Sequence, residues 1–271
     1  MTAALGVQSI DRVELDNRRV LVRLFLGPPV NAAGELANSG LLRTSLPTLE
    51  HARGAGARVV VAADLPAFEP GYEPPSLEWV GTCLSEMTGL DVLLPDDAVG
   101  DAAKKVIAEL RPGQLCLLEN LARHEEEERD EESFAAKLAR FTDVYVNDAF
   151  GACHRRTASL CSLPRLVPER AAGLALLREV EAFTRLSGTA KASVLVVLGG
   201  EGDGENLDRF EALLERAGTI ACAGALGALC RAARRSPASG AALEPALLSH
   251  ARTVLDRAER RGVDVLLLEG A

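Results

Sequence analysis

The sequence predicts an α/β fold: a doubly wound parallel sheet with helices on both faces, followed by a second, incomplete α/β unit. Short apolar runs alternate with helical patterns along the chain, which is typical of parallel sheets with crossover helices. The runs are apolar at consecutive positions, as expected for strands covered on both faces. A break at Ser187-Gly188-Thr189 interrupts the pattern. We therefore expect a first domain over residues 1–186, including a connecting helix, and a second over 187–271.

In the first unit, apolar runs predict strands and helical patterns lie between or after them. The expected strands are 19–26, 58–63, 92–94, 115–119 and 144–147, and the expected helices are 41–53, 77–88, 101–110, 131–142 and 171–186. Pro47 is expected near the first turns of its helix, and Arg111-Pro112-Gly113 is a helix stop signal. The acidic run Glu125 to Glu132 is interpreted as the solvated entry to a helix, where negative charge is favoured.

The second unit contains fewer elements than the first. Strands are expected at 193–198, 219–223 and 263–268, and helices at 207–216, 226–233 and 245–261. Three strands are fewer than most sheets contain, so we expect an exposed apolar edge. Homodimerisation, or capture by a protein partner through this unit, would follow. The alternative is that the helix at 245–261 folds back and covers the surface.

Composition narrows the function classes. Of the 271 residues, 48% are hydrophobic and 25% charged, which is an ordinary globular composition. The net charge of −9 argues against a general affinity for nucleic acid or an anionic membrane. The six cysteines form no CxxC pair, and Cys116, Cys153 and Cys222 sit in or beside predicted strands or buried motifs, so we expect reduced, mostly buried thiols. No apolar stretch approaches the roughly 20 residues of a membrane span. There is no secretory signal pattern either, so we expect a cytoplasmic protein.

Two segments carry a resemblance to a known family. The stretch Tyr145-Val146-Asn147-Asp148-Ala149-Phe150-Gly151-Ala152-Cys153-His154-Arg155 resembles the Asn-Asp-Ala-Phe-Gly-x-x-His-Arg signature of the phosphoglycerate kinases. Leu117-Leu118-Glu119-Asn120-Leu121, followed by His124, resembles a second family segment. The resemblance runs from about Val20 to Glu269 and implies two α/β domains joined by a helix. The first would hold 3-phosphoglycerate and the second the magnesium nucleotide. The implied chemistry is in-line phosphoryl transfer, which depends on positioning and positive charge.

Three basic residues match the family's pattern: Arg23 in the first strand, and the pair His154 and Arg155. The resemblance implies residual substrate or anion binding by these groups through charge-assisted hydrogen bonds. The alternative is structural, with these residues packing against the sheet and pairing with nearby acids. Weak binding of a small anion, such as sulfate or 3-phosphoglycerate, is expected near His154 and Arg155.

Elsewhere the family's substrate-binding groups are replaced. In Val22-Arg23-Leu24-Phe25-Leu26-Gly27-Pro28-Pro29, Phe25 and Gly27 stand where the family has an Asp and an Asn. Leu41 stands at the position of an Arg that opens the first helix. Arg43 is a displaced basic group that would point to another side of the helix.

Two further loops depart from the family. In Ala63-Asp64-Leu65-Pro66-Ala67-Phe68, Asp64 and Ala67 replace a His and an Arg, and an Asp would repel a phosphate. Arg123 lies one position after the family's Arg and is a second displaced basic group. Asn147 and Asp148 are expected to tie down a turn through side-chain to backbone hydrogen bonds. Gly151 is expected to permit a positive φ.

The nucleotide loop is degenerate. The resemblance aligns Gly199-Gly200-Glu201-Gly202-Asp203-Gly204-Glu205-Asn206 with a family loop in which two lysines face phosphates, and Gly202 and Asn206 take the lysine positions. Glycine-rich loops before helices often cradle phosphates, but three carboxylates oppose that use. We interpret the loop as a solvated turn and expect no metal site.

These replacements favour a catalytically inactive paralogue with a binding or regulatory role. No cofactor is then expected, and magnesium ATP would bind only if the protein is an enzyme. The alternative is a phosphoglycerate kinase itself, which acts in glycolysis and converts ATP and 3-phosphoglycerate to ADP and 1,3-bisphosphoglycerate. Such an enzyme would be impaired, or would depend on a second chain.

Overall fold

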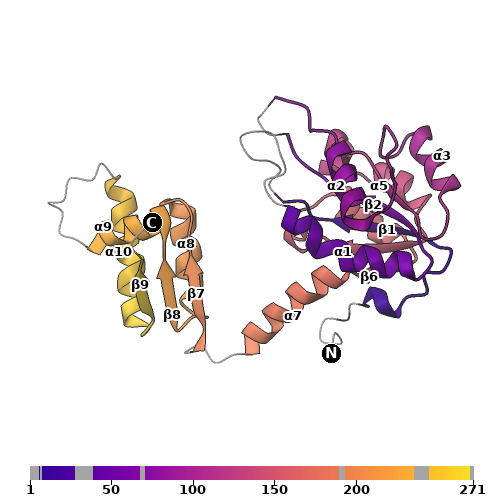
Figure 1. The fold of residues 1–271 in the computed structure, drawn as a ribbon. Coiled ribbons are helices and arrows are strands. Elements are labelled where there is room, and N and C mark those ends of the chain that lie inside the picture. The colour runs from indigo at the N-terminus through magenta and orange to yellow at the C-terminus, as the bar shows by residue number, and fades with distance from the viewer. Residues whose placement is uncertain are drawn as a thin grey trace. The chain divides into compact units, whose positions relative to one another are not determined.

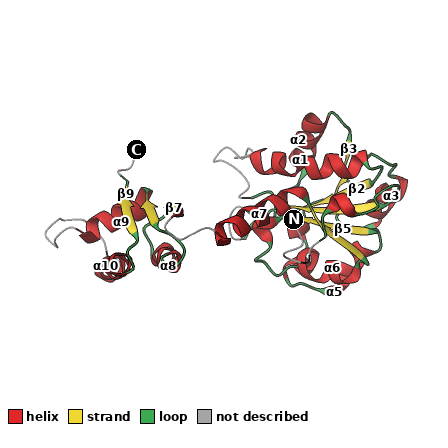
Figure 2. Ribbon diagram, turned by 90° about the horizontal axis from the view of Figure 1, so that it is seen from below, coloured by secondary structure: helices red, strands yellow, loops and turns green. Residues whose placement is uncertain are grey.

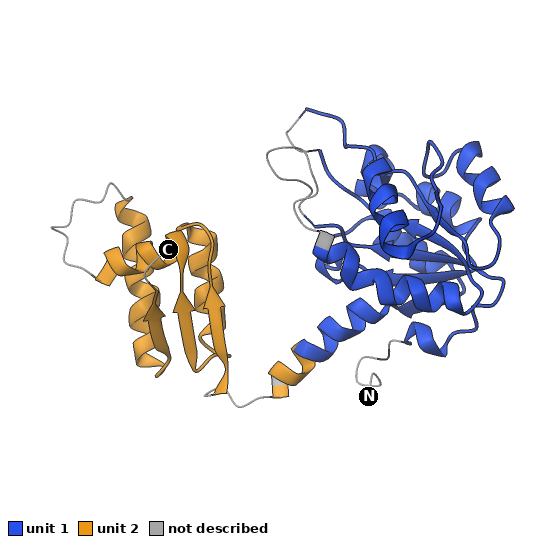
Figure 3. Cartoon of the chain, in the orientation of Figure 1, with its two compact units in different colours: residues 1–182 blue, residues 183–271 orange. Residues whose placement is uncertain are grey.

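The computed structural model describes residues 6, 8–27, 39–67, 71–188, 193–234 and 244–268 (Figure 1). Pro28, Pro29 and Phe68 of the family-like motifs lie outside these residues. The chain forms two compact units, residues 1–182 and 183–271 (Figure 3). The domain boundary that we expected between residues 186 and 187 stays a prediction.

A six-stranded parallel sheet forms the centre of the first unit, in the order β3-β4-β2-β1-β5-β6. Its strands are β1 (Arg19–Leu24), β2 (Arg58–Ala62), β3 (Val92–Leu93), β4 (Leu115–Leu117), β5 (Val144–Asp148) and β6 (Glu169–Ala172). β1 is central, and Leu21 stands beside Val60 of β2 and Tyr145 of β5. The strand order reverses at β1, because β2 lies on one side of it and β5 on the other.

Helices cover both faces of this sheet, as the sequence predicted. On one face, Val20 and Val22 pack with residues of α1 (Ser39–Gly54) and α2 (Glu78–Thr88). On the other face, Leu21 packs with residues of α3 (Asp101–Glu109), α5 (Glu132–Ala139) and α6 (Leu163–Leu166). Alternate residues of one strand thus enter two separate cores, so the run is apolar at every position. α4 (Glu125–Glu128) precedes α5, and α7 (Leu174–Gly188) follows β6.

Two local expectations in this unit are wrong. β6 was not expected, because Glu169–Ala172 is short and begins with two charged residues. Pro47 lies inside α1 instead of near its start, because the helix begins at Ser39, about two turns earlier. Turns and single-turn helices complete the unit: η2 (Ile10–Arg12), η3 (Leu121–Arg123), η4 (Phe150–Ala152) and the π-helical η5 (Ala158–Ser162).

The second unit is a three-stranded parallel sheet in the order β7-β8-β9. Its elements are β7 (Leu195–Leu198), α8 (Gly204–Leu213), β8 (Thr219–Cys222), α9 (Gly224–Arg234), α10 (Pro245–Arg260) and β9 (Asp264–Leu267). Both crossovers progress in the same direction across the sheet, and right-handed crossovers of this kind place all their helices on one face. α8 and α10 lie on the same side of the strands in Figure 2, and α8, α9 and α10 share one core with the sheet.

Among the described residues of this unit, the other face of the small sheet carries exposed apolar side chains. Leu195 and Val197 of β7 are 60% and 64% exposed, and Leu266 of β9 is 50% exposed. Their neighbours Val196 and Val265 point to the opposite face and pack against the core. α10 folds back onto the sheet and packs in this core, but it leaves Leu195, Val197 and Leu266 of the other face exposed. Association through this unit stays a prediction.

Two other expectations concern the whole chain. No helix in the described ranges is long and apolar enough to cross a membrane. All six cysteines carry free thiols, and Cys116, Cys222 and Cys230 are buried. Cys153 is exposed, contrary to our expectation.

Candidate functional site

Two of the basic residues that match the family, Arg23 and Arg155, meet Asp64 at the carboxyl ends of three neighbouring strands. Arg23 lies near the end of β1, Asp64 follows β2, and Arg155 follows β5. β2 and β5 flank β1 on its two sides. In doubly wound sheets, ligands bind at this edge, where the strand order reverses. The strand order thus places Asp64 and its two arginines at the edge where sheets of this kind bind ligands.

Asp64 occupies the centre of this location. One carboxylate oxygen, Oδ1, accepts a hydrogen bond from Arg23, and the other, Oδ2, accepts one from Arg155. The side chains of Arg23 and Asp64 are 0% and 3% exposed. Burial by itself raises the pKa of Asp64, but the charges and hydrogen bonds of the two guanidiniums outweigh it, so the pKa falls below its ordinary value. The carboxylate thus stays ionised between two arginines.

The remaining hydrogen bonds of Arg23 are also internal. Its Nε donates to Ser159 Oγ at 2.8 Å, and another guanidinium nitrogen donates to the Leu24 carbonyl. Ser159 in turn donates to Glu127 from its hydroxyl at 2.6 Å and from its backbone N–H at 2.9 Å. The Arg23 side chain is therefore closed off from solvent by its own partners, and residual anion binding by Arg23 stays a prediction.

Glu127 corrects our interpretation of the acidic run. Its side chain is buried, with only 1% of the residue exposed, although Glu125 and Glu128 beside it are exposed. This carboxylate can be buried because Ser159 donates two hydrogen bonds to it. Neither Glu127 nor Ser159 was singled out from the sequence. Arg23 in a predicted buried strand was the signal that could have led to them, because a buried arginine has several N–H donors and needs more than one partner.

Arg155 and His154 keep access to solvent. The Arg155 side chain is 32% exposed although it pairs with Asp64, and His154 is exposed. Weak binding of a small anion at these two residues stays a prediction.

The two displaced basic groups lie apart from Asp64 in the hydrogen-bond network. Arg123 donates from Nε to the Pro74 carbonyl at 3.0 Å and lies 3.5 Å from a carboxylate oxygen of Glu119. It therefore fastens the loop that precedes α2. Arg43 is exposed on α1.

The two family-like segments also support the loops of this edge. Asn120 is fully buried and makes hydrogen bonds with Leu65, Pro75 and Ala122. Asn147 Oδ1 accepts from Ala149 N, and Asp148 Oδ1 accepts from Ala175 N and Leu176 N at the start of α7. The expectation that Asn147 and Asp148 tie down backbone is confirmed.

The residues at the replaced positions just after β1 and on α1 lie against one another. A side chain on Gly27 would overlap Leu41, and one on Gly151 would overlap the Phe25 ring, with its Cβ 2.7 Å from Cδ1. Gly151 does not have a positive φ, so our expectation is wrong and its role is to make room for Phe25. Gly27 thus makes room for Leu41, and Gly151 makes room for Phe25.

The nucleotide loop is packed against α9. Gly200 has φ +114° and its carbonyl accepts from Leu226 N. A Cβ on Gly202 would lie 3.0 Å from the Ala225 carbonyl oxygen, and Gly199 is exposed. Asp203 caps α8 through Asn206 N at 2.8 Å, and the Asn206 side chain donates to the Glu201 carbonyl. The loop offers no lysine at Gly202 or Asn206, and its residues do not fit a magnesium nucleotide.

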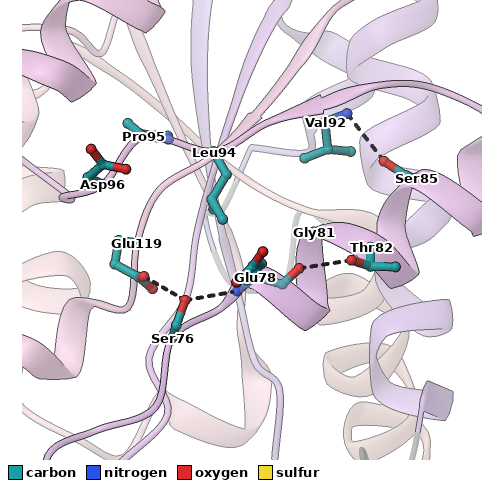
Figure 4. A pocket seen from close by; sticks show the side chains of 10 residues that line it. All are labelled: Ser76, Glu78, Gly81, Thr82, Ser85, Val92, Leu94, Pro95, Asp96 and Glu119. Atoms are coloured by element: carbon teal, nitrogen blue, oxygen red, sulfur yellow. Dashed lines mark hydrogen bonds between the residues drawn. The ribbon is translucent and has the colours of Figure 1, made fainter.

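A polar pocket of about 560 Å³ lies between α2, β3 and the end of β4 (Figure 4). Ser76 donates to Glu119, Thr82 donates to the Glu78 carbonyl, and Ser85 accepts from Val92 N (Figure 4). These polar groups hold α2 in place, so we assign the pocket no ligand. Across the described ranges, no group of three or more His, Cys, Asp or Glu side chains is arranged to hold a metal ion.

The fold and the site place the chain among doubly wound α/β proteins with a ligand edge at the carboxyl ends of parallel strands. The chain belongs to the phosphoglycerate kinase family, whose model matches residues 10–269. It is 37% identical to the phosphoglycerate kinase of Anaeromyxobacter dehalogenans (strain 2CP-1) over 97% of this chain and 67% of that protein. It is also 37% identical to that of Salinispora tropica, over 91% of this chain and 63% of that protein.

Solved structures agree with this assignment. The phosphoglycerate kinase of Coxiella burnetii matches with a TM-score of 0.76 at 25% identity, covering 96% of this chain and 66% of that one. That of Pyrococcus horikoshii OT3 matches with a TM-score of 0.77 at 26% identity, covering 94% and 64%. The chain therefore spans about two thirds of the length of the relatives that it matches.

Proposed function

We propose that this protein is a catalytically inactive paralogue of phosphoglycerate kinase with a binding or regulatory role. The observation that carries the proposal is the pairing of Arg23 and Arg155 with Asp64. Phosphoryl transfer needs cationic groups that can contact the transferring phosphate. Arg23 is fully buried, and Asp64 already balances its charge. An approaching phosphate would also be repelled by Asp64.

The second unit supports the same proposal. Gly202 and Asn206 stand at the positions that hold lysines in the family, and Glu201, Asp203 and Glu205 make the loop anionic. A lysine at residue 202 would also press against the Ala225 carbonyl. Magnesium ATP should therefore bind weakly or not at all, which calorimetry can measure. A micromolar dissociation constant would contradict this part of the proposal.

A coupled assay in both reaction directions tests the loss of activity. The purified chain is compared with the Anaeromyxobacter dehalogenans phosphoglycerate kinase at equal concentration. Since removing a single arginine clamp lowers phosphoryl transfer by about 10³-fold or more, we expect turnover at least about 10³-fold below that of the relative. Robust turnover that Arg155→Ala abolishes would overturn the proposal, since it would show that Arg155 still acts on substrate.

A further inference from the structure

Two cysteines lie together inside the second unit. Cys222 is the last residue of β8, and Cys230 lies in α9, the helix that follows this strand. Both residues are 0% exposed and belong to the same apolar core. Their side chains are joined by a hydrogen bond. The fold thus holds two free thiols in contact.

A glycine allows α9 to approach the end of β8 closely. A Cβ on Gly227 would lie only 2.7 Å from the Cys222 carbonyl oxygen, so a larger residue does not fit there without a shift. Gly227 and Cys230 are three residues apart in one helix and therefore share a face. The face of α9 that carries Cys230 is thus the one that meets the end of β8. A disulfide between a helix and a strand requires such an approach of the two backbones.

The surroundings favour the thiolate form of Cys230. The hydrogen bond with Cys222, assisted by the positive charges of Arg234 and Arg231, lowers the pKa of Cys230 although burial opposes the shift. The same hydrogen bond, together with burial, raises the pKa of Cys222. Since the thiolate is the reactive form of cysteine, the pair combines a nucleophilic sulfur with a protonated neighbour.

Cys116 of β4 shows what burial does to a thiol without these influences. It is also 0% exposed, and desolvation raises its pKa to about 12. A buried thiol of this kind is inert. Burial therefore does not explain the environment of Cys230, and Cys116 can serve as an internal control.

We propose that Cys222 and Cys230 form a peroxide-sensitive dithiol, which oxidises reversibly to a disulfide that fastens α9 to β8. A peroxide suits the site, because a small neutral oxidant can enter a core through local opening. Neither cysteine belongs to the arginine cluster or to the loop over residues 199–206, so the proposal stands whether or not the protein has kinase activity.

The reaction has two steps. The Cys230 sulfur attacks one oxygen of hydrogen peroxide, the O–O bond breaks, and the leaving hydroxide takes up the proton of Cys230 as water. The Cys222 sulfur then attacks the sulfur of the resulting sulfenic acid, the S–O bond breaks, and a second water leaves with the proton of Cys222. Two thiols are oxidised to one disulfide, and one peroxide is reduced to two waters. A dithiol reductant restores both thiols.

Peptide mapping of the full chain tests the proposal. The folded protein is treated with hydrogen peroxide, and the remaining thiols are alkylated in denaturant before digestion with trypsin. No Lys or Arg lies between Ala217 and Cys230, so both cysteines fall in one peptide, residues 217–231. We expect this peptide to lose two hydrogen atoms and to carry no alkyl group, and dithiothreitol to reverse the change.

The rate provides the comparison with an ordinary buried thiol. The pair should be oxidised at least about tenfold faster than Cys116, because only Cys230 has a lowered pKa. Equal rates would overturn the proposal. So would a peptide 217–231 that still carries two alkyl groups, or a disulfide from Cys230 to any cysteine other than Cys222.

Two variants separate the roles of the thiols. Cys222→Ala removes the second nucleophile, so Cys230 should stop at the sulfenic acid, which dimedone traps. Cys153→Ala removes an exposed thiol of the first unit and should leave the disulfide unchanged. A Cys222→Ala protein in which Cys230 does not react with dimedone would contradict the proposed attack by Cys230. The peptide map of the wild type decides the proposal even if Cys222→Ala fails to fold.

Discussion

Asp64 sets the charge balance at the carboxyl edge of the first sheet. Arg23 and Arg155 contribute two positive charges, and Asp64 and the buried Glu127 contribute two negative ones. A buried ion pair adds little stability compared with an apolar pair, but removing one partner leaves an uncompensated buried charge. Removal of the Asp64 side chain should therefore leave the buried charge of Arg23 without this partner.

Asp64→Ala should lower the free energy of unfolding by about 3–5 kcal/mol, because Arg23 would remain buried without its carboxylate. Urea denaturation of the purified variant measures the change. Arg129→Ala is the matched control, because Arg129 pairs with Glu125 on the surface and such pairs contribute about 1 kcal/mol or less. Equal losses in the two variants would contradict a special role for Asp64.

The pairing of Asp64 with Arg23 also predicts that the stability of the protein depends on pH. The pKa of Asp64 is lowered in the folded protein, so protons bind the unfolded chain more readily. Its contribution is complete above the unfolded pKa of about 4 and is lost as pH falls through the folded pKa. Urea midpoints should therefore fall more between pH 6 and pH 3 in the wild type than in Asp64→Ala. Parallel pH curves would show that other carboxylates account for the acid loss.

At the scale of elements, the segment after β1 packs closely against the turn after β5, and a glycine in that turn makes the close packing possible. Gly151 allows the Phe25 ring to lie where a side chain would stand. Gly151→Ala should therefore destabilise the protein by about 1–3 kcal/mol through overpacking. In the Phe25→Ala background the same change should have little effect, because the ring that it would strike is absent.

A double-mutant cycle by urea denaturation measures this coupling. Gly54→Ala is the matched control, because no atom outside its own helix lies within 4 Å of a Cβ at Gly54. Additive effects of Gly151→Ala and Phe25→Ala would mean that the two residues do not constrain each other.

At the scale of the whole molecule, strand order decides which sheet faces are covered. The first sheet continues on both sides of β1, so its crossovers supply helices to both faces. The second sheet continues in one direction only, so its described helices pack on one face. Leu195, Val197, Leu266 and Leu268 are exposed on the other face.

This open face should bind an uncharged apolar dye such as Nile red. Val197→Lys places a charge in the middle row of the face and should lower the dye fluorescence at least twofold. Thr253→Lys adds the same charge at an exposed position of α10 and should leave the signal unchanged. A Val197→Lys protein as fluorescent as the wild type would show that the dye binds elsewhere.

The sequence by itself determined the α/β class, the family and the loss of several basic groups. Strands buried on both faces must be apolar at every position, and Asn147 holds backbone that is near in sequence, at Ala149. The same reasoning did not reveal β6, whose four residues carry little apolar signal.

Only the tertiary structure showed which partners Arg23 and Arg155 have. They meet Asp64 because β2, β1 and β5 are neighbours in the sheet, although Asp64 is 41 residues from Arg23 and 91 from Arg155 in the chain. The burial of Glu127 and the open face of the second sheet follow from three-dimensional pairing in the same way. Local patterns carry information on what a segment forms, whereas a charge is neutralised by whichever partner the strand order brings beside it.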